Sequence, residues 1–176
     1  MPVRSSKDVV ESIFGPIGPV QARQQEAMKT LETLQVRDVM ERHFVILHPQ
    51  TTLREAIGVF VEKGIEGAPI VQDVALKGIL TNQDIVKLFE EKSLELSQHR
   101  HRAVNYEKEF RALGDKKVAE IGRRKISVFP NTSIFDAMTV MEENNLELIA
   151  VTDEAGAVRG IVNDSDILKT LMKILV

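Results

Sequence analysis

The chain has 176 residues, of which 43% are hydrophobic and 28% are charged, and its net charge at pH 7 is −3. This is the composition of an ordinary globular protein, and the length suits one domain or a compact pair of small ones. The slightly acidic balance argues against nucleic-acid binding, which normally needs a basic surface. The lack of cysteine excludes disulfides, thiolate nucleophiles and cysteine-based metal sites.

The N-terminal extension, residues 1–34, comes first in the chain. Asp8 and Glu11 interrupt the stretch in which a signal peptide would need an apolar run. No window of the whole sequence approaches the roughly 18 uninterrupted apolar residues of a membrane span. We therefore expect a soluble, cytoplasmic protein that does not contact membranes. Residues 15–19 read GPIGP, which predicts irregular structure, and residues 21–34 have the pattern of a mildly amphipathic helix.

Residues 35–88 predict a β-α-β-β-α unit. A β-rich run at 44–47 is followed by Pro49 and by Thr52, a preferred helix-capping residue. Apolar residues at helical spacing then predict a helix over 53–63. Two strands over 68–72 and 76–80 follow, and a second helix begins near residue 82. We expect residues 89–116 to prolong that helix and then to form a loop.

Residues 117–176 repeat the same unit, with strands at 126–129, 148–152 and 157–162 and helices starting at 134 and 164. GILTNQDIVK at 78–87 matches GIVNDSDILK at 160–169, and Pro49 matches Pro130. The spacing between the copies is 82 residues in the first match and 81 in the second. The one-residue difference falls in the turn between the two predicted strands, where insertions are tolerated, so the sequence indicates a true structural repeat.

Each copy resembles a cystathionine-β-synthase (CBS) domain, and the pair resembles a Bateman module. The resemblance rests on Gly78-x-x-Thr81-x-x-Asp84 after APIV at 68–71, and on the degenerate Gly160-x-x-Asn163-x-x-Asp166 after IAV at 149–151. It covers about residues 35–88 and 117–172. It implies an α/β fold in which the two copies pack around a pseudo-twofold axis, with two clefts that often bind AMP, ADP, ATP or S-adenosylmethionine for regulation.

The resemblance also implies which residues line each cleft. The first cleft would combine one copy's T-x-x-D residues with strand residues of the other copy: Thr81, Gln83, Asp84, Ile126, Leu146, Glu147 and Leu148. The second cleft would combine Asn163, Ser165, Asp166, Val45, Ile65, Glu66 and Gly67. Because only the first copy keeps the complete motif, we expect the first cleft to be the better site.

The residue types of the motif are themselves suited to binding a ligand, independently of the resemblance. Asp84 lies where a strand turns into a helix, and an ionised carboxylate there can accept both hydroxyl protons of a ribose. The helix N-terminus carries partial positive charge, which attracts an anionic group. The same residue types also serve as plain helix caps, so capping without a ligand is the alternative interpretation of Thr81 and Asp84.

At two positions, this sequence has glutamates where phosphate-binding members of the family differ. Glu66 and Glu147 stand where basic residues are often found, and they would repel a phosphate unless Mg²⁺ intervened. Candidate compensating cations are Arg124, Lys87 and Lys169. Otherwise the ligand carries little negative charge, as in adenosine or S-adenosylmethionine.

The last predicted helix is apolar on more than one face, which indicates burial in the core or in a homodimer interface. No common catalytic motif stands out. The sequence therefore predicts a non-enzymatic, dimeric regulatory module that binds an adenosine-containing ligand and signals to a partner protein. The alternative is a dimerising interaction scaffold whose clefts are vestigial.

Overall fold

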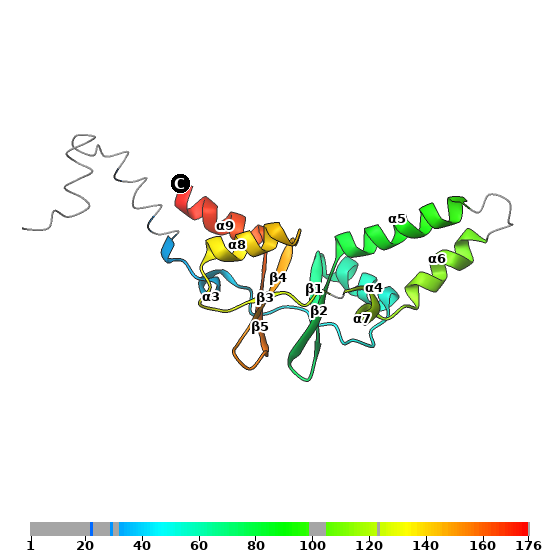
Figure 1. Ribbon diagram of the computed structural model, residues 1–176, viewed down its shortest axis with the longest axis horizontal. Helices are drawn as coiled ribbons and strands as arrows, with labels where there is room; N and C mark the ends of the chain where they lie inside the picture. The colour runs from blue at the N-terminus through cyan, green and yellow to red at the C-terminus, as the bar shows by residue number, and fades with distance from the viewer. Residues whose placement is uncertain (1–21, 23–28, 30–31, 99–104, 123, 176) are drawn as a thin grey trace, which may run out of the picture.

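The computed structural model describes residues 22, 29, 32–98, 105–122 and 124–175. Two halves, each a small sheet with helices on its outer side, meet with their sheets at the centre of the molecule (Figure 1). The mixed α/β fold built from two repeats is therefore confirmed. The helix predicted over residues 21–34 falls largely outside the described residues.

The first half contains α4 (Leu53–Lys63), β1 (Gly67–Gln72), β2 (Ala75–Thr81) and α5 (Asn82–Gln98). β1 and β2 are antiparallel, and Gly67 stands opposite Thr81. The strand predicted at 44–47 shrinks to a single parallel bridge between Leu47 and Ile70. The turn that begins at His48 ends the pairing on the C-terminal side of Leu47.

The helices α4 and α8 (Ile134–Glu143) each begin with a capping residue, and the one before α4 is the Thr52 that the sequence predicts. Thr52 Oγ1 accepts the backbone N–H of Glu55 at 3.3 Å, and Glu55 Oε2 accepts the N–H of Thr52 at 2.8 Å. This reciprocal pair satisfies two backbone groups that the first turn leaves unpaired. α4 ends at Gly64, whose φ of 63° suits glycine. In the second half Ser133 caps α8 by accepting the N–H of Asp136 at 3.0 Å.

The second half contains α8, β3 (Ser127–Val128), β4 (Leu148–Thr152), β5 (Val158–Asn163) and α9 (Asp164–Leu175). β4 lies in the middle of its sheet, parallel to β3 and antiparallel to β5. Between the halves, apolar side chains of both sheets form a shared core: Leu76, Ile79, Leu148, Ala150 and Ile161. This core packs β2 against β4 and β5, and it thereby holds the two copies next to each other.

The two copies exchange their first helices. α3 (Val36–Val39) belongs to the first copy in sequence, but Val36 is fully buried in the core of the second half. α7 (Val118–Ile121) belongs to the second copy, and Val118 is fully buried in the core of the first half. Backbone hydrogen bonds fix both exchanges, from Val36 N to Thr132 O at 2.9 Å and from Val118 N to Thr51 O at 2.9 Å. The sequence repeat therefore does not coincide with the packed half.

A second helix, α6 (Tyr106–Gly114), lies in the connecting segment where the sequence predicted a loop. Asn105 caps it by accepting the N–H of Lys108 at 3.0 Å. The helix packs against α4 and α5, and the Phe110 ring stacks on Phe89 with 5.7 Å between centroids. The loop prediction was wrong because Phe110 and Leu113, three residues apart, form the apolar face of a short helix. No helix within the described part of the chain is long and apolar enough to cross a bilayer.

Candidate functional site

Thr81 and Asp84 join the end of β2 to the start of α5. Asp84 Oδ2 accepts both the backbone N–H and the hydroxyl of Thr81, each at 2.9 Å. Thr81 Oγ1 in turn accepts the N–H of Asp84 at 3.3 Å. Thr81 is 2% exposed, so the motif holds the carboxylate in a fixed position at the first turn of the helix. One oxygen, Oδ1, points away from this cap.

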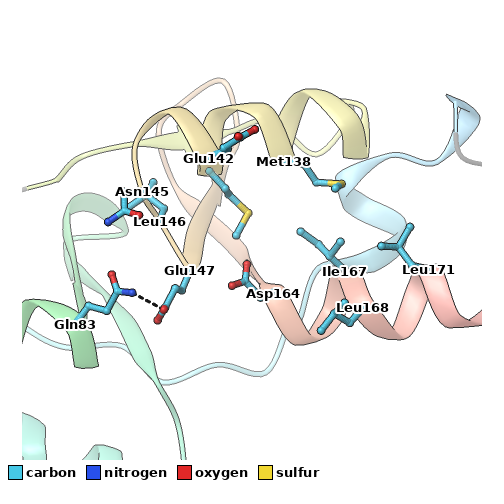
Figure 2. A pocket seen from close by; sticks show the side chains of 11 residues that line it. Gln83, Met138, Glu142, Asn145, Leu146, Glu147, Asp164, Ile167, Leu168 and Leu171 are labelled. Atoms are coloured by element: carbon cyan, nitrogen blue, oxygen red, sulfur yellow. Dashed lines mark hydrogen bonds between the residues drawn. The ribbon is translucent and has the colours of Figure 1, made fainter.

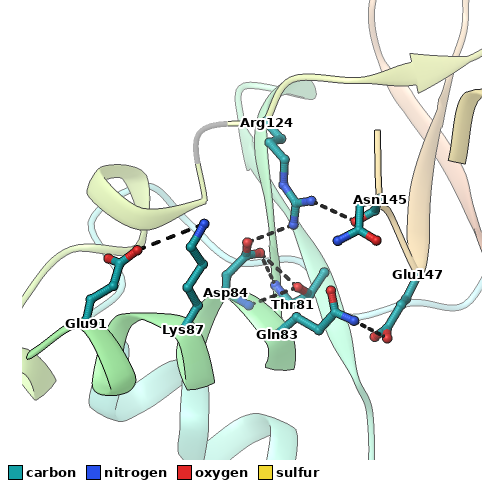
Figure 3. Close-up of polar contacts among 8 residues, drawn as sticks. All are labelled: Thr81, Gln83, Asp84, Lys87, Glu91, Arg124, Asn145 and Glu147. Carbon is teal, nitrogen blue, oxygen red and sulfur yellow. Dashed lines mark hydrogen bonds and ion pairs between the residues drawn. The ribbon is translucent and has the colours of Figure 1, made fainter. Parts of the chain in front are cut away.

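Arg124 reaches that second oxygen from the other copy. Its Nη2 donates to Asp84 Oδ1 at 2.7 Å, and its Nη1 donates to the carbonyl of Asn145 at 3.2 Å (Figure 3). The pair is partly shielded, with 31% of the Arg124 side chain and 20% of the Asp84 side chain exposed. Both carboxylate oxygens are thus engaged by the protein itself. The sequence singled out Arg124, but it gave no signal for Asn145.

Gln83 makes the second bridge between the copies. Its Nε2 donates to Glu147 Oε1 at 2.5 Å, beside the Asp84–Arg124 pair (Figure 3). Glu147 is therefore an acceptor for a neutral amide in this position. Lys87, one of the candidate cations, pairs with Glu91 of its own helix at 4.0 Å.

The degenerate motif of the second copy repeats the cap with weaker geometry. Asn163 Oδ1 accepts the N–H of Asp166 at 3.0 Å, and Asp166 Oδ2 accepts the N–H of Asn163 at 3.3 Å. The other oxygen of Asp166 pairs with Lys169 of the same helix at 3.4 Å. Asp166 is thus held within its own copy, whereas Asp84 is bridged to the opposite one.

A pocket of about 250 Å³ opens between the copies beside the second motif. Three residues predicted for the first cleft line it: Thr81, Glu147 and Leu148. Five residues predicted for the second cleft line it as well: Ile65, Glu66, Gly67, Asn163 and Ser165. Lys169, another candidate cation, also lines it. Val45 and Ile126 pack against the cores of the two halves and do not line this pocket.

Carboxylates dominate the charge around this pocket. Burial raises the pKa of Asp164, and the negative charge of Glu66 on the opposite copy raises it further. The backbone N–H of Asp164 donates to the Glu147 carbonyl at 3.2 Å, which holds the start of α9 near that glutamate. Opposed carboxylates favour neutral or cationic groups over phosphates. Within the described residues, no group of three or more His, Asp or Glu side chains is arranged to hold a metal ion.

A larger pocket of about 550 Å³ lies between α8 and α9, and it begins at the Gln83–Glu147 bridge (Figure 2). Leu146, predicted for the first cleft, lines it near that bridge. Glu142, Asn145 and Asp164 also line the pocket, and the apolar part of its wall includes Met138, Leu168 and Leu171. The sequence indicated these residues as core or as a dimer surface, because helical spacing alone does not distinguish an open apolar face from a covered one.

Two segments of the chain, residues 36–91 and 118–173, match the family model of the CBS domain. The uncharacterized protein MJ1232 of Methanocaldococcus jannaschii is 28% identical over 145 residues, which make up 82% of this chain and 42% of that protein. The chain therefore spans about two fifths of that relative's length.

Solved structures share the fold. The structure of CBSX2 in complex with AMP has a TM-score of 0.62 at 20% identity and covers 81% of this chain and 98% of that one. The CBS domain pair of protein MJ0100, in complex with 5′-methylthioadenosine and S-adenosylmethionine, has a TM-score of 0.62 at 22% identity. That match covers 80% of this chain and 98% of the other. With two family matches that span most of its length, the chain belongs to the CBS domain family, as a tandem pair.

Proposed function

We propose that this CBS pair is a regulatory module that binds adenosine-containing ligands between its copies and signals their presence to a partner protein. The observation that carries the proposal is the position of Asp84. Its carboxylate is fixed by Thr81 at a helix N-terminus and pairs with Arg124 of the opposite copy, beside the bridge from Gln83 to Glu147. Two relatives of the same fold were solved with AMP and with 5′-methylthioadenosine and S-adenosylmethionine, which supports ligands of this class.

In the first cleft, the ligand would exchange places with Arg124. A ribose hydroxyl would take over Asp84 Oδ1, which now accepts from the guanidinium at 2.7 Å. The released guanidinium carries a fork of donors suited to a phosphate. Arg124 would thereby change its partner from a carboxylate to the ligand's phosphate, and the first cleft is expected to favour AMP over adenosine.

In the second cleft, the charges favour a different ligand. Glu66 and Glu147 line the pocket of about 250 Å³, and the charge of Glu66 also acts on Asp164. A phosphate there would meet these carboxylates, and Lys169, which pairs with Asp166, is the one cation among the described lining residues that could offset them. We therefore expect this cleft to take neutral or cationic adenosine compounds such as 5′-methylthioadenosine or S-adenosylmethionine.

Calorimetric titration of the full chain with adenosine, AMP, ATP, 5′-methylthioadenosine and S-adenosylmethionine tests the proposal. A ligand that binds the folded state at about 100 times its Kd adds about 2.7 kcal/mol of stability. For a chain of this size that is a rise in Tm of roughly 5–10 °C. If none of the five gives heat or a shift in Tm, and Asp84→Ala behaves as the unaltered chain does with each of them, the proposal fails.

The second candidate function is an interaction scaffold with vestigial clefts. One observation favours it: both oxygens of Asp84 already accept hydrogen bonds, from Thr81 and from Arg124, so the carboxylate has partners without a ribose. Crystals soaked with the same compounds separate the two candidates. Empty clefts, together with a stable dimer in light scattering, would favour the scaffold, whereas density beside Asp84 or Asp166 would favour the regulatory module.

A further inference from the structure

The second half carries an open apolar face on α8 and α9. Phe135, Leu168 and Met172 are large apolar side chains with 41%, 63% and 60% of their surface exposed. Leu168 lines the pocket of about 550 Å³ together with Met138 and Leu171, while Phe135 and Met172 lie three and four residues from Met138 and Leu168 on the same helices (Figure 2). A contiguous apolar surface of this kind marks a site that another segment or molecule covers.

In the first half, the corresponding face is covered by the chain itself. α6 packs against α4 and α5, the helices that match α8 and α9 in the repeat. Phe110 of α6 stacks on Phe89, and Leu113 of α6 is 5% exposed within the core of that half. The residue that matches Phe89 in α9 is Leu171, which lines the open pocket.

The repeat identifies the segment that corresponds to α6. α6 ends four residues before Val118, the first residue of α7, and α7 is the short helix that inserts into the first half. Residues 24–32 end four residues before Val36, the first residue of α3, and α3 inserts into the second half. Residues 24–32 therefore have the same position in the sequence relative to α3 as α6 has relative to α7.

The two segments also match in sequence. QQEAMKTLE at 24–32 aligns with YEKEFRALG at 106–114, so that Met28 stands at the position of Phe110 and Leu31 at that of Leu113. Lys29 matches Arg111, and both are exposed and helical. The apolar pair thus recurs three residues apart, with a cation between them, which is the pattern of one helix face.

From this match, we propose that residues 24–32 dock on the α8–α9 face as a helix, with Met28 and Leu31 against Leu171 and Met138. The docked segment would cover the apolar face that α8 and α9 present. The face would then be an internal docking site of the chain and would not be available as an interface between two copies.

Disulfide trapping in the full chain tests this directly, because the natural sequence has no cysteine. The test variant carries Met28→Cys and Leu171→Cys. The positive control carries Phe110→Cys and Phe89→Cys, the matching pair that is in contact in the first half. The negative control carries Met28→Cys and Glu62→Cys, with Glu62 on an exposed face of α4. Circular dichroism of the reduced proteins checks that each variant folds.

On oxidation, we expect the test variant and the positive control to form an intramolecular disulfide, seen as a faster-migrating band of monomer mass on a non-reducing gel. The negative control should stay reduced. Disulfide-linked dimers of the test variant would overturn the proposal in favour of a second copy on the face. An unlinked test variant beside a linked positive control would overturn it outright.

Hydrogen exchange supplies a second readout that needs no cysteine. Met28→Asp should expose the α8–α9 face and raise amide exchange in α9 by about tenfold or more, because a buried apolar anchor is replaced by a charge. The matched control is Lys29→Asp, which makes a larger change in charge on the outward side and should leave α9 unchanged. Equal exchange in both variants and in the natural chain would overturn the proposal.

Discussion

The two motif sites of this molecule, which we propose as ligand clefts, share a backbone plan and differ in the arrangement of their charges. In the first, Asp84 is bridged to Arg124 of the other copy, and Gln83 donates a hydrogen bond to one oxygen of Glu147. In the second, Asp166 pairs with Lys169 of its own helix, and the carboxyl of Asp164 lies close enough to Glu66 for their charges to interact. Duplication supplied the geometry of both clefts, and a few substitutions at their rims set the chemistry of each.

The difference begins with one arginine. Arg124 is held toward the first cleft by the carbonyl of Asn145, a residue whose φ of 50° turns the backbone at that point. At the matching place of the first copy stand Arg42 and His43, both exposed, and Arg42 donates to the carbonyl of Arg37 at 3.4 Å. Among the contacts that the structure describes, the second cleft therefore has no cation from the opposite copy to match Arg124 in the first.

The largest expected effect on this comparison is the loss of AMP binding in Asp84→Ala. Hydrogen bonds to a charged group contribute about 1.5–3 kcal/mol each, so we expect AMP affinity to fall at least about tenfold. The matched variant Asp166→Ala should leave AMP affinity within about twofold and weaken 5′-methylthioadenosine instead. Titration calorimetry on both variants measures this, and an equal loss of AMP affinity in the two would remove the distinction between the clefts.

A second prediction concerns the exchanged helices that hold the clefts together. A Cβ atom at Gly122, just after α7, would lie 2.6 Å from the carbonyl oxygen of Ile79 and 2.9 Å from its carbon. Because backbone must shift, we expect Gly122→Ala to lower the free energy of unfolding by about 1–3 kcal/mol. Gly58→Ala is the control: its Cβ meets nothing within 4 Å in α4, and it should stabilise by about 0.5–1 kcal/mol. Urea unfolding of both variants measures the difference, and a neutral Gly122→Ala would contradict the tight packing of α7.

Much of this architecture could be predicted from the sequence, because periodic apolar residues and capping residues such as Thr52 act locally. The exchange of α3 and α7 could not, since Val36 and Val118 occupy equivalent positions whether each packs in its own copy or in the other. The repeat identified Asp84 and Arg124 as candidates, but their ion pair depends on Asn145, which orients Arg124 through a backbone carbonyl. A carbonyl acceptor leaves no trace in residue identity, and neither does an uncovered helix face.

Arg124→Gln should make the first cleft resemble the second, which has no matching cation in the described part of the chain. The substitution removes the cation expected to contact phosphate and frees Asp84 Oδ1, so we expect AMP to bind a few-fold more weakly and adenosine to bind more tightly. The effect is modest because a partly exposed ion pair contributes only about 0–1 kcal/mol. Arg159→Gln is the control, since Arg159 pairs with Asp153 in the turn before β5. Parallel changes for AMP and adenosine in Arg124→Gln would show that Arg124 does not discriminate between them.

The smallest expected effect is the pH dependence of stability that Asp164 contributes. Burial and the charge of Glu66 raise the pKa of Asp164 above its usual 3.8, so the folded state holds this proton more tightly than the unfolded state does. Its contribution to stability is therefore present at low pH and is lost as pH rises through the raised pKa. Asn82 occupies the matching position of the first copy, and Asp164→Asn copies it. Because Asp164 is exposed and solvent screens its charge, we expect the variant to gain at most about 0.3 kcal/mol over the natural chain at pH 7 and to lose this advantage toward pH 4.

Asp153→Asn should behave in the opposite way and serves as the control for that experiment. A backbone hydrogen bond from Ala157 and the guanidinium of Arg159 lower the pKa of Asp153, so its ionised form stabilises the folded state above pH 3.8. The asparagine variant should then be less stable than the natural chain at pH 7, with the gap closing as pH falls. Thermal unfolding between pH 2 and pH 8 measures both variants, because the gap for Asp153→Asn should close only below pH 3.8. If Asp164→Asn tracked Asp153→Asn, the opposed carboxylates would not be the feature that sets the second cleft apart from the first.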